Sequence, residues 1–533
     1  MGMKEIHSRW SSYILQGVVF ALTLFIPLYP KIPLFDVAFT WTYIRLEDVL
    51  VAVSFAVLTV ALIFKRAHIK NGLFWPIVIF WIVGLLSTIW ALMTLGKEDN
   101  WAIFKPHLIV LHYFRRIEYL GVLFVAYAAM SQSKWSGVRR YIGVLVVGLT
   151  GVVAYGLGQK FLHFPAYLTM NEEFSKGTPI ALQAGSRLSS TFGGHYDLAG
   201  YLVLVLPIVL GLAWYARNKM YKGLFIVLSA LGFFVLMLTS SRISFLAFFV
   251  SLAVLAFLLI KQKRTVVIGG IVAVLLTLIV GRNSIVERLG KTIRFKQVVV
   301  EQSTGKVMEI PTVDKDWGGL PESDRVFVLP FLKGEATGSA YKVTKYEKGD
   351  INPLDSTPDD VVRNTVEIPQ TATKETMTGE KREIIEEVRT VHGAFEKKLA
   401  LIFDISFTTR IDGSWPKTLD AFAKRPILGQ GYSTVTAAVD SSYVRALGEV
   451  GLVGIISFLA IMVIFIRKAY RFITHTSNPF ARLFISGVLA GVVGIMVNAT
   501  LIDIFEASKV AFMLWLTMGV ALWVIEKSEE GRL

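Results

Sequence analysis

The stretch Gly451-Leu-Val-Gly-Ile-Ile-Ser-Phe-Leu-Ala-Ile-Met-Val-Ile-Phe-Ile466 contains no charged residue and is followed at once by Arg467-Lys468. With the residues back to position 443 it has the length, about 20 residues, that a helix needs to cross a hydrocarbon core roughly 30 Å thick. Basic residues directly after such a segment are typical of its cytoplasmic boundary. The sequence therefore predicts a membrane-spanning helix over residues 443–466.

The composition of the whole chain agrees with that prediction. The 533 residues are 54% hydrophobic and 18% charged, whereas soluble domains carry about 25% charged residues. Apolar segments of similar length recur along the chain. They lie near residues 12–29, 46–64, 73–95, 117–131, 141–162, 197–215, 223–240, 243–260, 265–281, 443–466, 483–501 and 505–525. We therefore expect an all-α polytopic membrane protein with about 12 transmembrane helices.

The first apolar segment resembles a signal peptide, because Lys4 and Arg9 precede it. It leads into Tyr29-Pro-Lys31 without the small-residue pattern of a cleavage site, so we expect an uncleaved first helix. Cysteine is absent from the chain. The sequence therefore offers no disulfide framework, thiolate metal site or cysteine nucleophile.

The orientation follows from the connections between segments. Every second connection is short, basic and free of acidic residues; these five carry Lys65-Arg66, Lys134, Arg217, Lys261 and Arg467-Lys468. The positive-inside rule places them in the cytoplasm together with both termini, and it places the alternate loops outside. We expect a protein of the cytoplasmic (inner) membrane whose large loop, residues 282–442, is extracytoplasmic.

The net charge of +15 belongs to the membrane part of the chain. Residues 282–442 contain 23 basic and 24 acidic residues, which leaves 32 basic and 16 acidic residues elsewhere. Because these basic residues are scattered over helix ends instead of forming one stripe, we expect no nucleic-acid partner. The lipid bilayer is the expected partner.

The large loop is expected to form an α+β domain between a membrane domain of residues 1–281 and a second one of residues 443–533. From about 295 to 367, β-branched runs alternate with Gly, Pro and Asp turns, which predicts a strand-rich insert. The part from about 379 to 426 reads as helical. Glu383 to Phe403 carries apolar residues at spacings of three and four, which predicts an amphipathic helix. Ser414 and Pro426 mark the start and the stop of a further helix.

Several arginines lie where topology does not require basic residues. On the predicted outer side are Arg115, Arg116, Arg187, Arg242 and Arg410. A guanidinium presents a fixed fork of donors that matches phosphate oxygens, so this set indicates an anionic ligand. For Arg115 and Arg116, interfacial snorkelling and local pairing with Glu118 are the alternative.

Two further segments combine several polar side chains at the edge of the membrane. In Arg187-Leu-Ser-Ser-Thr-Phe-Gly-Gly-His-Tyr-Asp197, His195 and Asp197 stand directly before a predicted span. Asp197 is a candidate helix N-cap and His195 a candidate for local hydrogen bonding, while exposed amides at such a helix start also form an anion site. Asp440 and Glu449 flank the entry to the span at 443; we favour a functional role for Asp440 and an ion-pair or packing role for Glu449.

Taken in order, these segments resemble the O-antigen ligase and polymerase family of bacterial membrane glycosyltransferases. The resemblance covers most of the chain apart from the strand-rich insert. It rests on four pieces: Arg187 to Pro207, Thr239-Ser-Ser-Arg242, Arg410 with Trp415 to Gly431, and Asp440 to Gly454.

The resemblance implies transfer of a glycan from a polyprenyl diphosphate carrier to a hydroxyl of a glycan, lipid or protein acceptor, at the outer face of the membrane. It implies neither a metal nor a cofactor. Arg242 and Arg410 correspond to the family's diphosphate-binding arginines, and Asp440 stands in the segment that holds the family's histidine, where a carboxylate can accept the hydroxyl proton. Further candidates for the diphosphate are Arg187, His195 and Arg116, and supporting roles are expected for Asp197, Tyr443 and Glu449.

Two alternatives stay open at the level of sequence. A transporter or flippase also has about twelve spans, although such proteins usually show internal repeats and broken helices at the bilayer midplane. A non-catalytic, glycan-binding relative is the second alternative, because Asp440 replaces the family's histidine. Ligase and polymerase differ in their acceptor, and these motifs do not distinguish between the two activities.

Overall fold

The structure is a computed structural model. It describes residues 3–37, 43–95, 106–131, 135–169, 172–183, 185–260, 293–301, 307–308, 326–328, 362–372, 385–403, 409–435 and 439–529. The chain forms two compact units, one of Met1–Ile285 with Ser414–Leu533 and one of Val286–Gly413. Each unit is considered by itself.

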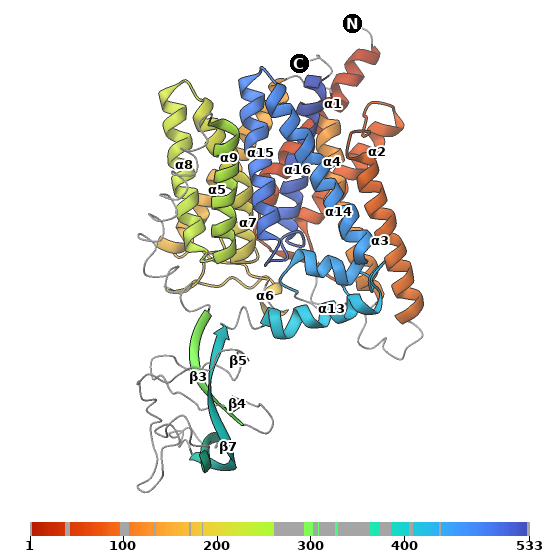
Figure 1. Ribbon diagram of the computed structural model, residues 1–533. Helices are drawn as coiled ribbons and strands as arrows, with labels where there is room; N and C mark the ends of the chain where they lie inside the picture. The colour runs from red at the N-terminus through yellow and green to blue at the C-terminus, as the bar shows by residue number, and fades with distance from the viewer. Residues whose placement is uncertain are drawn as a thin grey trace. The chain divides into compact units, whose positions relative to one another are not determined.

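The first unit is a bundle of long helices (Figure 1). Among the described residues, nine helices are long and apolar enough to cross a membrane: α2 (Leu46–Ile63), α3 (Phe74–Leu95), α5 (Trp135–Phe161), α7 (His195–Tyr215), α8 (Lys219–Leu238), α9 (Arg242–Leu259), α14 (Ser442–His475), α15 (Pro479–Asn498) and α16 (Ser508–Glu529). Two more long helices are α1 (Met3–Leu28) and α4 (Pro106–Met130). The chain is therefore a multi-pass membrane protein. The predicted span at 265–281 lies outside the described residues.

Several boundaries differ from the predicted ones, among them those of α4, α14 and α16. Helix α4 begins at Pro106 instead of 117, because a proline is well suited to the first helical turn, so Arg115 and Arg116 lie inside the helix. Helix α14 continues to His475 past its basic residues. Helix α16 begins at Ser508, which leaves Phe505 and Glu506 in the preceding turn.

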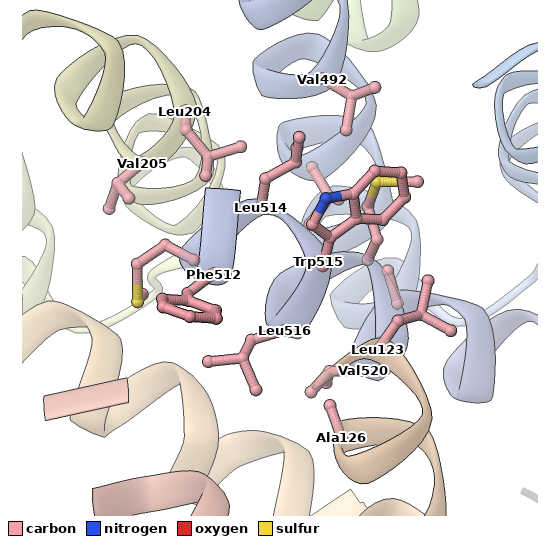
Figure 2. Close-up of a cluster of buried hydrophobic side chains, with 14 of the residues drawn as sticks. Leu123, Ala126, Leu204, Val205, Val492, Phe512, Leu514, Trp515, Leu516 and Val520 are labelled. Carbon is pink, nitrogen blue, oxygen red and sulfur yellow. The ribbon is translucent and has the colours of Figure 1, made fainter. Parts of the chain in front are cut away.

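Helix α16 lies at the centre of the bundle. Its membrane window is 94% buried, whereas those of α2 and α8 are 28% buried, so these two face the surroundings. Figure 2 shows its side chains packed among neighbouring helices: Phe512, Leu514, Trp515, Leu516 and Val520 meet Leu204 and Val205 of α7, Val492 of α15, and Leu123 and Ala126 of α4. At Gly491 the backbone of α15 lies directly against Leu204, a close approach that small residues allow between membrane helices.

The start of α1 and the end of α16 lie at the same end of the bundle (Figure 1). At the opposite end, the short amphipathic helix α13 (Trp415–Lys424) runs across the bundle axis, and a further short helix is α6 (Glu172–Ser175). Helix α13 starts after Ser414 and ends just before Pro426, which confirms the predicted start and stop. A small ribbon of β1 (Pro33–Asp36) and β2 (Tyr43–Arg45) joins α1 to α2.

The compartment that each end faces stays a prediction, and the absence of cysteine makes it testable. Single cysteines at Lys134, Gln183, Arg264 and Ser356 are to be treated with an impermeant maleimide on intact cells. We expect labelling at positions 183 and 356 only, because positions 134 and 264 lie in basic, cytoplasmic connections. Labelling at 134 or 264 contradicts the orientation, and permeabilised cells provide the control for reactivity.

The second unit contains a five-stranded antiparallel sheet. Its central strand β7 (Ile385–Phe403) pairs with β3 (Ile293–Glu301), β5 (Val326–Val328) and β6 (Val362–Ala372), and β4 (Val307–Met308) pairs with β3. Strands β3, β4 and β5 lie within or at the edge of the region in which strands were predicted.

The predicted amphipathic helix over Glu383–Phe403 is wrong, because this region is strand β7. A spacing of four residues is also a multiple of two, so positions 391, 395, 399 and 403 share one face of a strand as well as one face of a helix. Long-range pairing with β3 and β6 decides between the two, and such pairing leaves no local signal.

Candidate functional site

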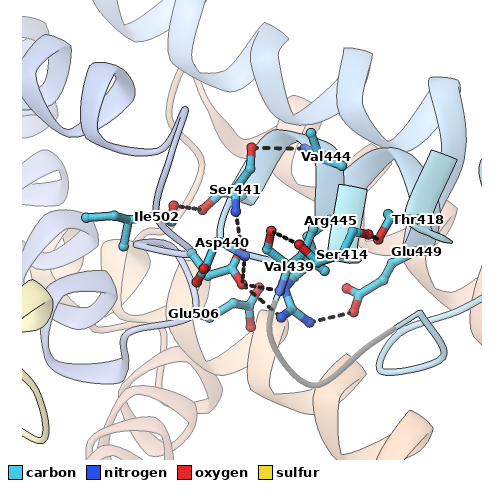
Figure 3. Close-up of polar contacts among 12 residues, drawn as sticks. Ser414, Thr418, Val439, Asp440, Ser441, Val444, Arg445, Glu449, Ile502 and Glu506 are labelled. Carbon is cyan, nitrogen blue, oxygen red and sulfur yellow. Dashed lines mark hydrogen bonds and ion pairs between the residues drawn. The ribbon is translucent and has the colours of Figure 1, made fainter. Parts of the chain in front are cut away.

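The first feature of the site is the short segment that leads into α14. Asp440 is half-buried and has φ of +57°, a left-handed conformation that residues with a side chain rarely adopt. The backbone amides of Val439, Asp440 and Ser441 each donate to the carboxylate of Asp503, with distances of 3.2 Å. The Ser441 side chain caps α14 by accepting from the amide of Val444 at 3.3 Å (Figure 3). The predicted site residue Asp440 is therefore held in a defined backbone geometry.

A network of buried ion pairs follows within two turns of α14. The guanidinium of Arg445 donates to Asp503 at 2.8 Å and to Glu449 at 3.2 Å. Arg116 of α4 pairs with Glu506, lies 3.7 Å from Glu449, and stacks over the ring of Tyr432. This confirms the predicted ion-pair role of Glu449. Arg115 is instead paired with Asp48 and Glu118, as the local-pairing alternative expected.

The network contains more carboxylates than guanidiniums. Asp503, Glu449 and Glu506 face Arg116 and Arg445. Burial raises the pKa of Glu506, but the neighbouring guanidiniums of Arg116 and Arg445 outweigh burial and hold it below the ordinary value of 4.5. Because three carboxyl groups surround two guanidiniums, the network has little positive charge to offer a further anion.

A small cavity opens beside this network. Its polar wall consists of Arg116, Arg445, Glu449, Glu506 and Ser442, and its other walls are largely aromatic. The aromatic lining residues are Phe80, Tyr119, Tyr432, Phe458, Phe505 and Trp515. Small-molecule sites typically have a few convergent polar groups on an otherwise apolar wall.

Helix α14 is interrupted beside the cavity, at Gly451. This residue has φ of +66° and ψ of −166°, so the helix consists of two helical pieces. The freed amides of Leu452 and Val453 donate to Pro426 and Ile427, at 2.8 and 3.2 Å. Gly429 has φ of +69° and lies against the backbone of Glu449, so a side chain at 429 has neither room nor a favourable conformation. The amides of Gln430 and Gly431 donate to the carbonyls of Gly448 and Glu449, both at 2.8 Å, so the turn at 427–432 fixes the position of Glu449.

Arg242 begins α9 and is half-buried. Two residues later, the hydroxyl of Ser244 donates to Asn498 at 3.1 Å. The amide of Ser442, two residues after Asp440, donates to the neighbouring carbonyl of Ala499 at 3.0 Å. The segments that contain Arg242 and Asp440 therefore meet at one turn, residues 498–507 between α15 and α16.

The predicted segment at the start of α7 also lies near this turn, since Gly200 packs against Ile504 and Asn498. Arg187 is exposed and its Nη1 lies 2.9 Å from Nε2 of the buried His195. Asp197 is not the N-cap, because the helix begins at His195 and Gly194 takes the cap position. Asp197 lies in the first turn, where a carboxylate interacts favourably with the helix dipole.

Two further predicted residues have other surroundings. Tyr443 donates its hydroxyl to the carbonyl of Met496 at 2.8 Å, and its ring lies near Phe505. Tyr443 therefore supports the packing of α14 on α15. Arg410 is buried and belongs to the unit Val286–Gly413. Its predicted partnership with Arg242 stays a prediction.

Sequence reasoning missed Asp503 and Glu506. Both lie in Ile502-Asp-Ile-Phe-Glu506, at the predicted start of the last span. Two acidic residues at the edge of an apolar segment are costly unless paired, and this rule was the available signal. Their partners, Arg445 and Arg116, are far away in the sequence, so only the fold identifies them.

A second buried charge cluster was also missed. Lys31 donates to Glu47 at 2.5 Å and to Ser508, and both charged side chains are almost fully buried. Lys509 donates to the carbonyls of Tyr29 and Thr191. The second carboxylate oxygen of Glu47 has no hydrogen-bond partner among the described residues. This cluster ties the first turns of α2 and α16 to the end of α1.

Comparison with known proteins adds no relative: no family model matches the chain, and no curated protein matches it. Its helices and its bilayer-length apolar segments define it as a multi-pass membrane protein. The buried ion network and the amphipathic cavity at one end of the bundle define the candidate site.

Proposed function

We propose that this protein transfers a glycan from a polyprenyl diphosphate carrier to an acceptor hydroxyl, as a ligase or polymerase of the O-antigen type. The proposal rests on the resemblance of its motifs and on one structural observation. The half-buried Asp440, the segment of Arg242 and the amphipathic cavity all adjoin the turn between α15 and α16.

The lining of the cavity suits a sugar residue. Carboxyl oxygens accept hydrogen bonds from hydroxyl groups, and Glu449 and Glu506 provide such oxygens on the polar wall. Aromatic rings such as those of Trp515 and Phe458 offer flat apolar surfaces on the other walls. The cavity therefore favours a neutral, hydroxyl-rich group over a diphosphate.

The diphosphate is assigned to Arg242 and Arg410 on the resemblance alone, because the two residues belong to different units of the structure. Arg116, a further candidate from the sequence, is engaged by two carboxylates and offers a second anion little net charge. We infer instead that Arg116 has a structural role, in which it forms part of the cavity wall. The polyprenyl tail then lies along the apolar helix surfaces that face the bilayer.

In the proposed reaction, the acceptor oxygen attacks the anomeric carbon of the carried glycan. The bond from that carbon to the phosphate oxygen breaks, and its electron pair leaves with the polyprenyl diphosphate. The hydroxyl proton passes to Asp440. Arginine guanidiniums stabilise the charge on the leaving group, because fixed donors in a poorly hydrated site act more strongly than in water.

The test is the transfer activity of the reconstituted protein. Asp440→Ala is expected to lower the turnover of lipid-linked glycan at least about a hundredfold, since a positioned general base contributes roughly that much or more. Asp420→Ala, which alters an exposed carboxylate on α13, is the matched control. Undiminished turnover by Asp440→Ala contradicts the proposed role.

Transport of a lipid-linked glycan is the second candidate function, and the break of α14 at Gly451 favours it. Interrupted helices with satisfied backbone groups often form the binding sites of transporters. The same reconstituted system separates the two functions. Transfer consumes the lipid-linked donor and forms a new glycosidic bond, whereas transport moves the donor across the bilayer unchanged.

A further inference from the structure

The carboxylate of Asp503 receives an unusual number of donors from one short segment. The three successive amides of Val439, Asp440 and Ser441 donate to it, as does the guanidinium of Arg445 at 2.8 Å (Figure 3). Successive amides around a left-handed residue form a concave anion-binding nest. Here the side chain of Asp503 occupies that nest.

The conformation of Asp440 depends on this contact. A non-glycine residue in the left-handed region is strained, and such strain persists only where the surroundings fix it. The turn between α15 and α16 supplies part of these surroundings, and α13 supplies another part, because the hydroxyl of Ser414 and the indole N–H of Trp415 donate to the carbonyl of Val439 at 3.1 Å. Ser442 adds to them, because its hydroxyl donates to the carbonyl of Ile502 at 3.2 Å and accepts from the amide of Phe505 at 3.4 Å.

The same turn also orders the cavity. Glu506, three residues after Asp503, holds Arg116, and Asp503 itself holds Arg445. A displacement of the turn therefore moves the segment of Asp440 and the polar wall of the cavity together. Asp503 connects the two.

We infer that Asp503 is a positioning residue, which fixes the backbone of residues 439–441 and so directs Asp440 toward the reacting hydroxyl. The role in positioning Asp440 for catalysis rests on the proposed function. The role of Asp503 in fixing the backbone of residues 439–441 does not depend on it. Asp503 takes no proton in the reaction, because its oxygens accept from three amides and from Arg445.

The first test measures steady-state kinetics. Asp503→Ala is expected to lower kcat about 10- to 100-fold with little change in KM for the donor, since a misplaced catalytic group costs about that much. Asp503→Asn is expected to recover part of kcat, because its amide oxygen still accepts from the backbone amides. Asp420→Ala is the control. An unchanged kcat, or a change in KM alone, overturns the inference.

The second test needs no activity and uses the absence of cysteine. Val439→Cys places a thiol at a fully buried position in the segment. Adding Asp503→Ala is expected to raise the rate of maleimide labelling at least tenfold, whereas adding Asp420→Ala leaves the rate unchanged. Equal rates with and without Asp503→Ala overturn the inference.

The two tests separate the inference from the proposed function. A wild-type protein that transfers no glycan contradicts the proposed function, and the labelling rates then still decide whether Asp503 holds the segment. If Asp503→Ala does not fold, Asp503→Leu with Val439→Cys is the variant to compare. It keeps about the volume of the side chain and removes both oxygens that accept from the three amides, so labelling at the wild-type rate contradicts the inference.

Discussion

Replacing Arg445 with alanine is expected to lower the free energy of unfolding by about 3–5 kcal/mol, the usual cost of removing one partner from a buried ion pair. Arg445 is 6% exposed and pairs with both Asp503 and Glu449. Among the described residues, its loss leaves Asp503 without a cationic partner and leaves Glu449 with only the more distant guanidinium of Arg116. Denaturant unfolding of the purified protein in detergent micelles measures the change.

Two further variants sharpen this prediction. Arg445→Lys keeps the charge, but an ammonium lacks the forked donors that reach both carboxylates, so an intermediate loss is expected. Lys176→Ala removes an exposed pair with Glu173 and is expected to leave unfolding unchanged. A loss for Arg445→Ala no larger than that of the Lys176 control shows that the network does not stabilise the fold.

Replacing Glu47 with alanine is the second change with a large expected effect, again about 3–5 kcal/mol of unfolding free energy. Glu47 is completely buried and is the ion-pair partner of Lys31. Without Glu47, the positive charges of Lys31 and of the nearby Lys509 are buried without its carboxylate. The double variant Glu47→Ala with Lys31→Met is expected to recover part of the loss, because it removes one of these charges along with its partner.

The pH dependence gives an independent check on this cluster. Burial lowers the pKa of Lys31 from its ordinary 10.5, an effect that exceeds the opposing attraction of Glu47. The unfolded chain therefore binds the proton of Lys31 more tightly, so stability rises as the pH increases toward 10.5. In Glu47→Ala the pKa of Lys31 falls further, and the loss of stability is expected to shrink at alkaline pH. A loss that is constant over this range, or that grows, contradicts the assignment.

Much of the fold was predictable because its signals are local. Membrane thickness sets the length of a span. The segment 443–466, with its uncharged run from Gly451 to Ile466, has the length that is needed. Likewise, Pro426, which cannot continue a helix, lies just after the end of α13. Strand β7 was not predictable, since its apolar spacing fits two periods and its partners lie in distant segments.

The site was predictable only in part. Sequence reasoning selected Asp440, Arg116 and Glu449, and the structure brings the segments of all three to one end of the bundle. It did not select Asp503 or Glu506, whose partners are far away along the chain.

The sequence by itself determined that this chain crosses a membrane many times, since burial in lipid depends on the apolar length of each segment taken alone. The tertiary structure alone decided which charges are paired, what lines the cavity, and how the backbone at Asp440 is held. A buried charge is tolerated only beside its partner, and helix packing across the bundle determines which residues become partners.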